Sequence, residues 1–454
     1  LRVSFSLFPF STSPPSSLLL FFSLINDESF PFSSMIRRRN NINEPHQDYS
    51  PYPPSDQLNH RQHQEYVGLI LDDDEIQKRL RCCRPSKLKP PAPLTNSLVS
   101  NELIGQAIKL LKDEIHGSEG FLIEENVMWV TSIDGRLLRT VNGRIEDSMF
   151  LSDKCSVSDR SHCGRPLGIR RLNVSSLLVV DAYLGIISVD FPNKKVSTLL
   201  PSSSPIDRLT TLHYIHDVAV VDSDNIVLTE RSIKYSPHFR PYERMEHQPN
   251  GRLFHYEISR NRITLLLEGL FEPSGIEVAQ DRDHIIFAET GTGEVLSYHM
   301  RTKGLTKFTE NLPGLPSLIR LNQHRDALWV GIEEVRFSET GAPKSLPEYL
   351  QEWPFVRKIL LSIFPSEIFK AIYRSFAPPH LMAVKYNMQG QPLVSVQGPR
   401  GIPNEHRVKS IAQVSENSEG VFLSFSKGNH IAKINKRYVD ALQQGIATSA
   451  RRRG

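Results

Sequence analysis

Acidic residues that end apolar segments are the first candidates for chemistry in this chain of 454 residues. Asp181, Glu230 and Glu289 each close such a segment, where a carboxylate could face a central channel or accept hydrogen bonds from a turn. The turn role is the more common one for acidic residues at the ends of strands. The chain contains no Gly-x-Ser-x-Gly, no His-Glu-x-x-His and no Gly-x-x-x-x-Gly-Lys. Local motifs therefore identify no nucleophile, zinc protease site or phosphate-binding loop.

The four cysteines fall into two pairs, and one pair bears on the compartment. Cys82 and Cys83 are adjacent, whereas Cys155 and Cys163 are eight positions apart in a polar segment. That spacing fits a small disulfide-closed loop in an oxidising compartment or two reduced thiols in a cytosolic loop. The glycosylation acceptor Asn173-Val174-Ser175 follows shortly afterwards. The pair and the acceptor together favour the secretory pathway.

The charge of the chain is nearly balanced. Lys and Arg number 54 and Asp and Glu number 50, which gives a formal net charge of +4. So small an excess over this length predicts a mixed solvated surface and no nucleic-acid partner.

Residues 1–92 are rich in Ser, Pro, Asn and Gln and show no sustained periodicity. This composition predicts a disordered or targeting region ahead of the main domain. The apolar run Leu18 to Ile25 resembles a signal-peptide core, but no basic cluster precedes it and it is too short to span a bilayer. The segment therefore gives no clear anchor or signal.

Short β-type segments repeat along the rest of the chain. Six apolar segments are each followed, after a turn or a longer connection, by a segment in which apolar and polar residues alternate. Such a repeat predicts an all-β, six-bladed β-propeller over residues 93–440, because radial closure leaves only short sheet edges. The apolar segments begin at Val127, Ser176, Asn225, His284, Ala327 and Gly420, and their alternating partners begin at Gly135, Gly185, Gly251, Gly293, His380 and His430.

Three segments depart from the β pattern. Residues 346–376 have apolar residues at helical spacing interrupted by Pro365, which predicts a short helical insertion. This insertion either caps one face of the propeller, which we favour, or lies on a membrane surface. Leu103 to Ile115 also has helical spacing and predicts a short amphipathic helix, and residues 441–454 form a basic tail.

Several strings resemble the strictosidine-synthase-like propellers. The resemblance runs from about Pro91 to about Lys436 and is carried by collinear strings in every blade. It implies the six-bladed propeller and, more distantly, a relation to the paraoxonases and other calcium-dependent propeller esterases and lactonases. The strings are CGRPLGIR (163–170), DAYLGI (181–186), NGRLFHY (250–256), FAETGTGEVLSY (287–298) and LPGLPSLIR (312–320).

The resemblance also implies a compartment. Members of the family are typically anchored membrane proteins or secretory-pathway glycoproteins, with a disulfide matching Cys155 and Cys163 and a glycosylation acceptor matching Asn173. A lumenal or extracellular propeller, with contact to a membrane surface, is therefore expected. This chain departs from the family at the anchor, where it has only Tyr66 to Leu71 followed by three aspartates. That run is too short to cross a bilayer.

The resemblance places a family calcium site at five positions, most of which have changed here. Glu119 retains the acidic ligand, whereas His216 and Ser274 each stand where the family has Asn. Ser317 and Leu318 replace a paired Asp and Asn. Since calcium needs several oxygen ligands with negative charge, the pattern predicts a degenerate site that binds calcium weakly or not at all. Glu119 with His216 could favour zinc, but a polar, water-filled channel is the interpretation we prefer.

Two functions of different classes follow. The first is a metal-assisted, arylesterase-like hydrolase of esters or lactones with weak activity, in which Glu119, His216 and Asp217 form a reworked centre. The second is a non-catalytic lumenal or membrane-associated propeller that binds a ligand of unknown identity. A strictosidine synthase is not expected, because Gln413 replaces the glutamate of the plant condensing enzymes and cannot accept a proton.

Overall fold

The computed structural model of the chain describes Cys83 and residues 88–155, 163–309, 312–338, 342–403 and 408–453. The predicted disordered or targeting region, including Leu18 to Ile25 and Tyr66 to Leu71, lies almost entirely outside these residues. The following description concerns the described part of the chain alone.

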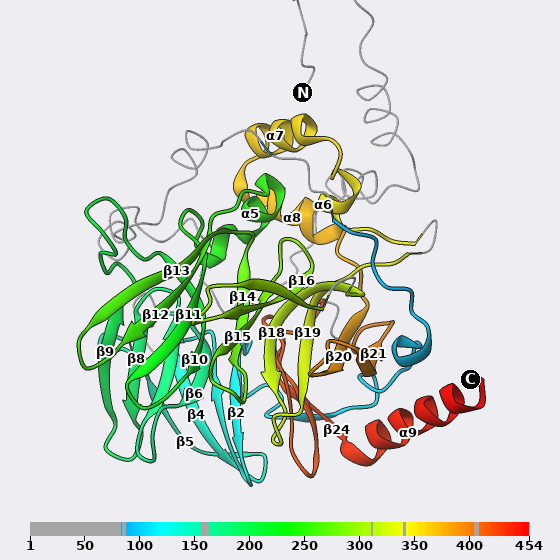
Figure 1. Cartoon of the computed structure of the whole chain (residues 1–454), viewed down its shortest axis with the longest axis horizontal. Helices are drawn as coiled ribbons and strands as arrows, with labels where there is room; N and C mark the ends of the chain where they lie inside the picture. Colours follow the sequence, from blue (N-terminus) through cyan, green and yellow to red (C-terminus); the bar gives the residue numbers. More distant parts are fainter. Residues whose placement is uncertain are drawn as a thin grey trace, which may run out of the picture. The chain divides into compact units, whose positions relative to one another are not determined.

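The described residues form a six-bladed β-propeller, as predicted (Figure 1). Each blade is a four-stranded antiparallel sheet, and in the first five blades the strand that comes first in the sequence is the inner one, next to the neighbouring blades. The first blade contains β2 (Phe121–Glu124), β3 (Val127–Thr131), β4 (Arg136–Val141) and β5 (Arg144–Phe150), and the second contains β6 (Pro166–Arg171), β7 (Leu177–Asp181), β8 (Gly185–Asp190) and β9 (Lys195–Pro201). The third contains β10 (Tyr214–Val220), β11 (Asn225–Ser232), β12 (Gly251–Glu257) and β13 (Arg262–Leu270), and the fourth contains β14 (Pro273–Val278), β15 (His284–Glu289), β16 (Glu294–His299) and β17 (Leu305–Thr309). The fifth contains β18 (Gly314–Leu321), β19 (Ala327–Val335), β20 (Leu381–Asn387) and β21 (Pro392–Gly398).

The predicted segments are the two middle strands of each blade. In the first blade, for example, β3 and β4 pair antiparallel with Met128 opposite Thr140. The turn between β4 and β5 has positive φ at Asn142 (50°) and Gly143 (77°), which is the backbone that a two-residue hairpin requires. The repeating hairpins that indicated a propeller are therefore confirmed.

The last blade joins the two ends of the propeller. It contains β22 (Val414–Glu416), β23 (Gly420–Leu423), β24 (Ile431–Asn435) and, as its outermost strand, β1 (Ile108–Leu110). Residues from the start of the domain thus close the ring by pairing with its last strand, Ile108 lying opposite Lys433.

The helix predicted for Leu103 to Ile115 is wrong, because β1 occupies the centre of this segment. Backbone pairing with β24 overrides the helical spacing, and positive φ values at Leu111 (56°) and Asp113 (65°) end the strand. The apolar residues that gave the helical pattern are instead buried in contacts with different blades, Ile104 in one core cluster and Leu111 and Ile115 in another.

Four α-helices gather at one end of the propeller and are called the cap (Figure 1). They are α5 (Arg240–Glu246) between β11 and β12, and α6 (Leu346–Tyr349), α7 (Pro354–Ile363) and α8 (Ser366–Ser375), which form the predicted insertion between β19 and β20. The cap is held by buried contacts: Arg357 Nη1 donates to the Met245 carbonyl at 2.9 Å, and the rings of Tyr242 and Phe369 lie 4.8 Å apart.

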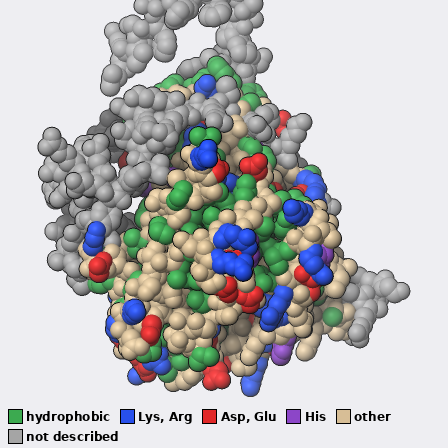
Figure 2. Space-filling model, turned by 60° about the vertical axis from the view of Figure 1, so that its left-hand side comes forward, with side chains coloured by type: hydrophobic (Ala, Val, Ile, Leu, Met, Phe, Trp, Pro, Cys, Tyr) green, Lys and Arg blue, Asp and Glu red, His purple; other side chains and the backbone are tan. Residues whose placement is uncertain are grey.

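The outer side of the cap is partly apolar. Tyr349, Phe355, Ile363 and Ile368 expose between 43% and 69% of their surface. Figure 2 shows hydrophobic side chains at this end of the molecule, whereas charged side chains of both signs are interspersed over the face in view. Contact of the cap with a membrane surface remains a prediction. No helix among the described residues is long and apolar enough to cross a membrane.

Two short helices and one longer helix complete the fold: η3 (Asn96–Leu98), η4 (Pro237–Phe239) and α9 (Lys436–Arg453). The residues predicted as a basic tail belong to α9, which packs Val439, Leu442 and Ile446 against the core between the last two blades.

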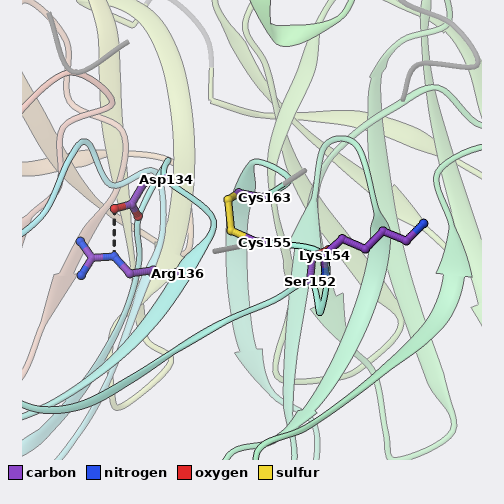
Figure 3. The surroundings of a disulfide bond; sticks show 6 residues. All are labelled: Asp134, Arg136, Ser152, Lys154, Cys155 and Cys163. Carbon is purple, nitrogen blue, oxygen red and sulfur yellow. Dashed lines mark hydrogen bonds and ion pairs between the residues drawn. A yellow bond between two sulfur atoms is a disulfide. The ribbon is translucent and has the colours of Figure 1, made fainter. Parts of the chain in front are cut away.

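A disulfide joins Cys155 to Cys163 (Figure 3). It ties the end of the first blade to the start of the second. The alternative of two reduced thiols is thereby excluded for this structure, and the pairing implied by the family resemblance is confirmed.

Candidate functional site in the central channel

The inner strands bring the predicted ligand positions to the central channel. Glu119 precedes β2, His216 lies in β10, Ser274 in β14 and Ser317 in β18, and all four are buried. Hydrogen bonds between neighbouring blades hold this level of the channel together. Ser274 Oγ donates to the Ser317 carbonyl at 3.0 Å, and Ser424 Oγ donates to the Glu119 carbonyl at 3.0 Å.

An arginine contacts each of the two strongest predicted ligands. Arg165 Nη2 donates to Glu119 Oε1 at 2.9 Å, and Arg240 Nη1 lies 4.0 Å from the same oxygen. Arg231 Nη1 lies 3.5 Å from His216 Nε2. The side chains expected to coordinate a metal are therefore engaged by guanidinium groups.

The environment keeps His216 uncharged. Its burial lowers its pKa well below the usual value, and the positive charges of Arg231 and Arg240 lower it further. The imidazole is therefore neutral near pH 7.

These contacts belong to a larger set of ion pairs, called here the arginine cluster. It comprises Arg165, Arg231, Arg240 and Arg244 with Glu119, Glu272 and Glu333. The pairs are close: Arg231 Nη2 lies 2.7 Å from Glu272 Oε2, Arg240 Nη2 lies 2.5 Å from Glu333 Oε2, and Arg244 Nε lies 2.5 Å from Glu272 Oε1. Arg240 and Arg244 come from α5, so the cap closes this end of the channel with charged side chains.

The cluster shifts the pKa values of its carboxylates. Burial alone would raise the pKa of Glu272, but Arg244 and Arg231 outweigh burial and lower it to about 2. Burial likewise opposes ionisation of Glu333, yet the positive charges of Arg240, Arg231 and Arg244 hold its pKa far below the usual range. Both carboxylates are therefore ionised near pH 7.

This predicts an acid-sensitive contribution to stability. Because the folded pKa values of Glu272 and Glu333 lie below the ordinary value of 4.5, their contribution is complete above about pH 4.5 and is lost as the pH falls towards 2. We expect Glu333→Gln to lower the free energy of unfolding at pH 7, and the difference from wild type to shrink between pH 4.5 and 2. Urea denaturation at a series of pH values measures this, and a difference that stays constant down to pH 2 would contradict it.

Asp217 lies in a separate set of ion pairs. Its carboxylate accepts hydrogen bonds from Arg320 Nη1 at 2.7 Å, from Arg170 Nη2 at 3.3 Å and from the Ile276 amide at 3.0 Å. Arg170 also donates to Glu277 Oε1 at 3.1 Å. None of these described contacts joins Asp217 to Glu119 or His216, although Asp217 follows His216 directly in the sequence. The three residues proposed as a reworked centre are not connected as one.

Gln413 links neighbouring inner strands. Its Oε1 accepts from Arg320 Nε at 3.0 Å, and its Nε2 donates to the Phe121 carbonyl at 2.6 Å. The Gln413 amide thus joins the last blade to the first through its donor, and to the ion pairs of Asp217 through its acceptor.

The carboxylates at strand ends act as hydrogen-bond acceptors for turns and neighbouring groups. Asp181 Oδ1 accepts from the amides of Tyr183 and Leu184 at 2.9 Å each. Glu289 Oε1 accepts from the Phe271 amide at 2.8 Å, and Glu230 Oε1 accepts from the His213 amide at 2.6 Å. The turn interpretation is therefore confirmed for Asp181, and the other two carboxylates are also committed to structural bonds.

The sequence-based prediction missed the arginine cluster. The one local signal was a Glu-Arg pair, Glu230-Arg231, at the end of an otherwise apolar strand. A charged pair there must find partners when the strand is buried, but its partners lie far away in the sequence.

The donor set at this level does not suit calcium. Ca²⁺ takes roughly six to eight oxygen ligands, and its affinity depends on the number of carboxylates. Glu119 is the one carboxylate among the predicted ligands, it already accepts from Arg165, and Leu318 offers no side-chain donor. Among the residues that the structure describes, no group of three or more His, Cys, Asp or Glu side chains is arranged to hold a metal ion.

Asn173 occupies an exposed turn between β6 and β7. Its Oδ1 accepts from the amides of Ser175 and Ser176, at 3.0 and 2.9 Å, and the adjoining Val174 is fully exposed. The glycosylation acceptor is thus placed where an enzyme could reach it, and its modification stays a prediction.

Comparisons with known proteins agree with this fold. The family model described as "Strictosidine synthase" matches residues 216–303. The chain is 27% identical over 375 residues to "Adipocyte plasma membrane-associated protein" of Bos taurus, covering 81% of this chain and 86% of that protein. It is also 27% identical over 364 residues to the protein of that name from Homo sapiens, covering 78% and 84%.

Among solved structures, a gluconolactonase of Xanthomonas campestris aligns with a TM-score of 0.47 and 13% identity, covering 77% of this chain and 96% of that one. The chain thus contains a match to the strictosidine synthase family model within its propeller, and it is similar to the adipocyte plasma membrane-associated proteins over most of its length.

Proposed function

We propose that this protein is a ligand-binding propeller without calcium-dependent ester or lactone hydrolysis. The observation that carries the proposal is the position of the guanidinium groups: Arg165 binds Glu119 at 2.9 Å and Arg231 lies 3.5 Å from His216. The two side chains best suited to a metal are engaged by permanent positive charges.

The electrostatics of the arginine cluster support the proposal. Its four guanidinium groups and three carboxylates leave a net charge of +1 before any metal is added. A divalent cation at Glu119 would lie close to Arg165 and Arg240 in a buried region, where repulsion between like charges is screened weakly. Calcium would therefore have to displace both arginines from Glu119.

The competing function is a metal-assisted hydrolase centred on Glu119, His216 and Asp217. It would need Glu119 released from Arg165 and Asp217 released from Arg320 and Arg170. Removing any of these three arginines from its carboxylate leaves an uncompensated buried charge, which is costly. For this reason the binding function is preferred.

We place the propeller in the lumen of the secretory pathway or outside the cell, in association with a membrane. The disulfide between Cys155 and Cys163 supports an oxidising compartment. The exposed position of Asn173 and the membrane-associated name of the relatives support the same location.

The test is metal content, thermal stability and hydrolysis by the full chain expressed through an oxidising compartment. We expect no stoichiometric calcium, the same melting temperature in calcium and in chelator, and no hydrolysis of aryl esters or lactones above background. A site saturated a hundredfold above its Kd would add about 2.7 kcal/mol to stability, enough for a shift of several degrees.

A calcium-dependent propeller lactonase assayed in parallel serves as the positive control, and Glu119→Gln as the site control. Stoichiometric calcium that raises the melting temperature, lost in Glu119→Gln, would refute the proposal and restore the hydrolase as the better function.

A further inference from the structure

The arginine cluster has more hydrogen-bond donors than the structure supplies acceptors for. Among the described residues, the buried Nε atoms of Arg165, Arg231 and Arg240 and the Nη1 atom of Arg244 have no hydrogen-bond partner. The same holds for the hydroxyl of Tyr214. Buried polar groups without partners are costly, so a set of five around one cluster indicates missing acceptors.

Several of these donors surround the same place. Tyr214, Arg231, Ser236 and Arg240 line one narrow space at the cap end of the channel. Tyr214 Oη, Ser236 Oγ and the Nε atoms of both arginines are all unpartnered there, and so is Oε2 of Glu243, the one carboxyl group among the residues that line the space. Arg231 and Tyr214 are 1% and 2% exposed, so bulk water does not satisfy them.

The charge of this space is positive. Glu243 also lines it, but burial and the negative charge of Glu272 raise the pKa of Glu243 to about 8, so its carboxyl is largely protonated near pH 7. The carboxylates of the cluster do not offset its four arginines, and the net charge is +1. Lys427 interacts electrostatically with Arg165 and Arg240 and adds a further positive charge nearby.

We propose that this space binds the oxyanion of a small ligand, either a carboxylate or a phosphate, through Arg231, Arg240, Tyr214 and Ser236. Guanidinium groups form the strongest hydrogen bonds with such oxygens. The hydroxyl groups of Tyr214 and Ser236 complete a set of hydrogen-bond donors that suits an anion and not a cation. The inference deepens the proposed function and rests on it. A calcium ion at Glu119 would attract the carboxylates of the cluster away from its arginines.

The site has an entry route. The space between the side chains, as it stands, is too narrow to hold a water molecule, so an oxyanion must move one of the lining side chains. Arg240 and Arg165 keep 20% and 24% of their side chains exposed, whereas Arg231 keeps 1%. Displacement of Arg240, at the start of the short helix α5, therefore opens the space from the cap side.

The experiment is isothermal titration calorimetry of the full chain with inorganic phosphate and, separately, with benzoate, at an ionic strength held constant with sodium chloride. We expect saturable binding of one equivalent of at least one of the two anions, and the stronger of the two identifies the ligand class. Tyr214→Phe should weaken binding at least fivefold while leaving the melting temperature unchanged or raised. A purely structural tyrosine whose hydroxyl has no partner would not show that combination.

Arg240→Gln should weaken binding tenfold or more. The matched control is Arg136→Gln: the Arg136 side chain is 24% exposed, close to the 20% of Arg240, and pairs with a buried carboxylate, Asp134, at 2.9 Å (Figure 3), but Arg136 lies outside the cluster. This control should leave the affinity unchanged. If Arg240→Gln does not fold, Tyr214→Phe still decides the outcome.

The inference is overturned if neither anion gives saturable binding, or if Tyr214→Phe binds as tightly as wild type. Its failure is separate from failure of the proposed function. Absence of both anion and calcium binding overturns only the oxyanion site, whereas stoichiometric calcium overturns the proposed function and with it this inference.

Discussion

Replacing Asp217 by asparagine is expected to lower the free energy of unfolding by about 3–5 kcal/mol, because it leaves the buried Arg320 and the partly buried Arg170 without their shared carboxylate. Asp217 is fully buried and lies 2.7 Å from Arg320 and 3.3 Å from Arg170. Asparagine keeps the size of the side chain but removes its charge. The two guanidinium groups would then face each other with Glu277 as the one remaining carboxylate of this set.

Chemical denaturation at pH 7 measures the effect, and a matched surface pair gives the control. Asp283 pairs with Arg301, whose side chain is 75% exposed, so Asp283→Asn should cost less than about 1 kcal/mol. A comparable small loss for Asp217→Asn would show that Arg170 and Arg320 find other partners or water, and the account of this ion-pair set would be wrong.

This prediction also separates stability from catalysis. Asp217 was one of three residues proposed for a reworked catalytic centre. A variant that unfolds would lose any activity, whether or not Asp217 takes part in catalysis. The contacts of Asp217 with Arg320 and the Ile276 amide favour the structural role. Activity measurements on Asp217 variants are therefore informative only when the folded fraction is measured alongside.

The fold could be read from the sequence because its middle strands have a clear pattern. A strand in which polar, less buried residues recur between buried apolar ones, such as β16, shows its period directly, and six such hairpins indicate a propeller. The inner strands have no such pattern. In β10 the sequence YIHDVAV is buried at all but its last residue, so polar side chains there face the channel rather than solvent and no alternation separates the two faces.

The strand β1 was missed for a different reason. Three residues pair with the far end of the chain, and nothing local distinguishes them from a helical turn. A propeller closes by pairing strands that are far apart in the sequence. A short stretch of sequence around β1 therefore contains no information about the strand with which β1 pairs.

The candidate site was only partly predictable. The family resemblance located Glu119 and His216 at the channel; the structure buries both side chains, and their role as metal ligands stays a prediction. The arginines that contact them could not be inferred, since each comes from another segment of the chain: 46 residues separate Arg165 from Glu119, and 15 separate Arg231 from His216. A substitution at a predicted ligand position is visible in a sequence, but charged partners that come from other blades become visible only when the blades are brought together.

The second large effect is expected at Gly275, where the inner strands of two blades approach each other closely. A Cβ atom at this position would lie 2.2 Å from the Ile319 amide nitrogen and 2.6 Å from the Leu318 Cα atom. Both atoms belong to the backbone of β18, so no side chain can rotate away. We expect Gly275→Ala to lower the free energy of unfolding by about 3 kcal/mol or more, the cost of forcing packed elements apart.

The control for this substitution is expected to change the free energy of unfolding in the opposite direction. Gly445 lies in α9 with nothing within 4 Å of the position of its Cβ atom, so Gly445→Ala should stabilise the protein by up to about 1 kcal/mol through helix propensity. Equal stabilities of the two variants in urea denaturation would contradict the close approach of β14 to β18. The consequence reaches the channel, because Ser274, next to Gly275, donates to the Ser317 carbonyl across the same contact. A side chain at Gly275 would separate the two blades at the level of the arginine cluster, so the same variant should also weaken any anion bound there.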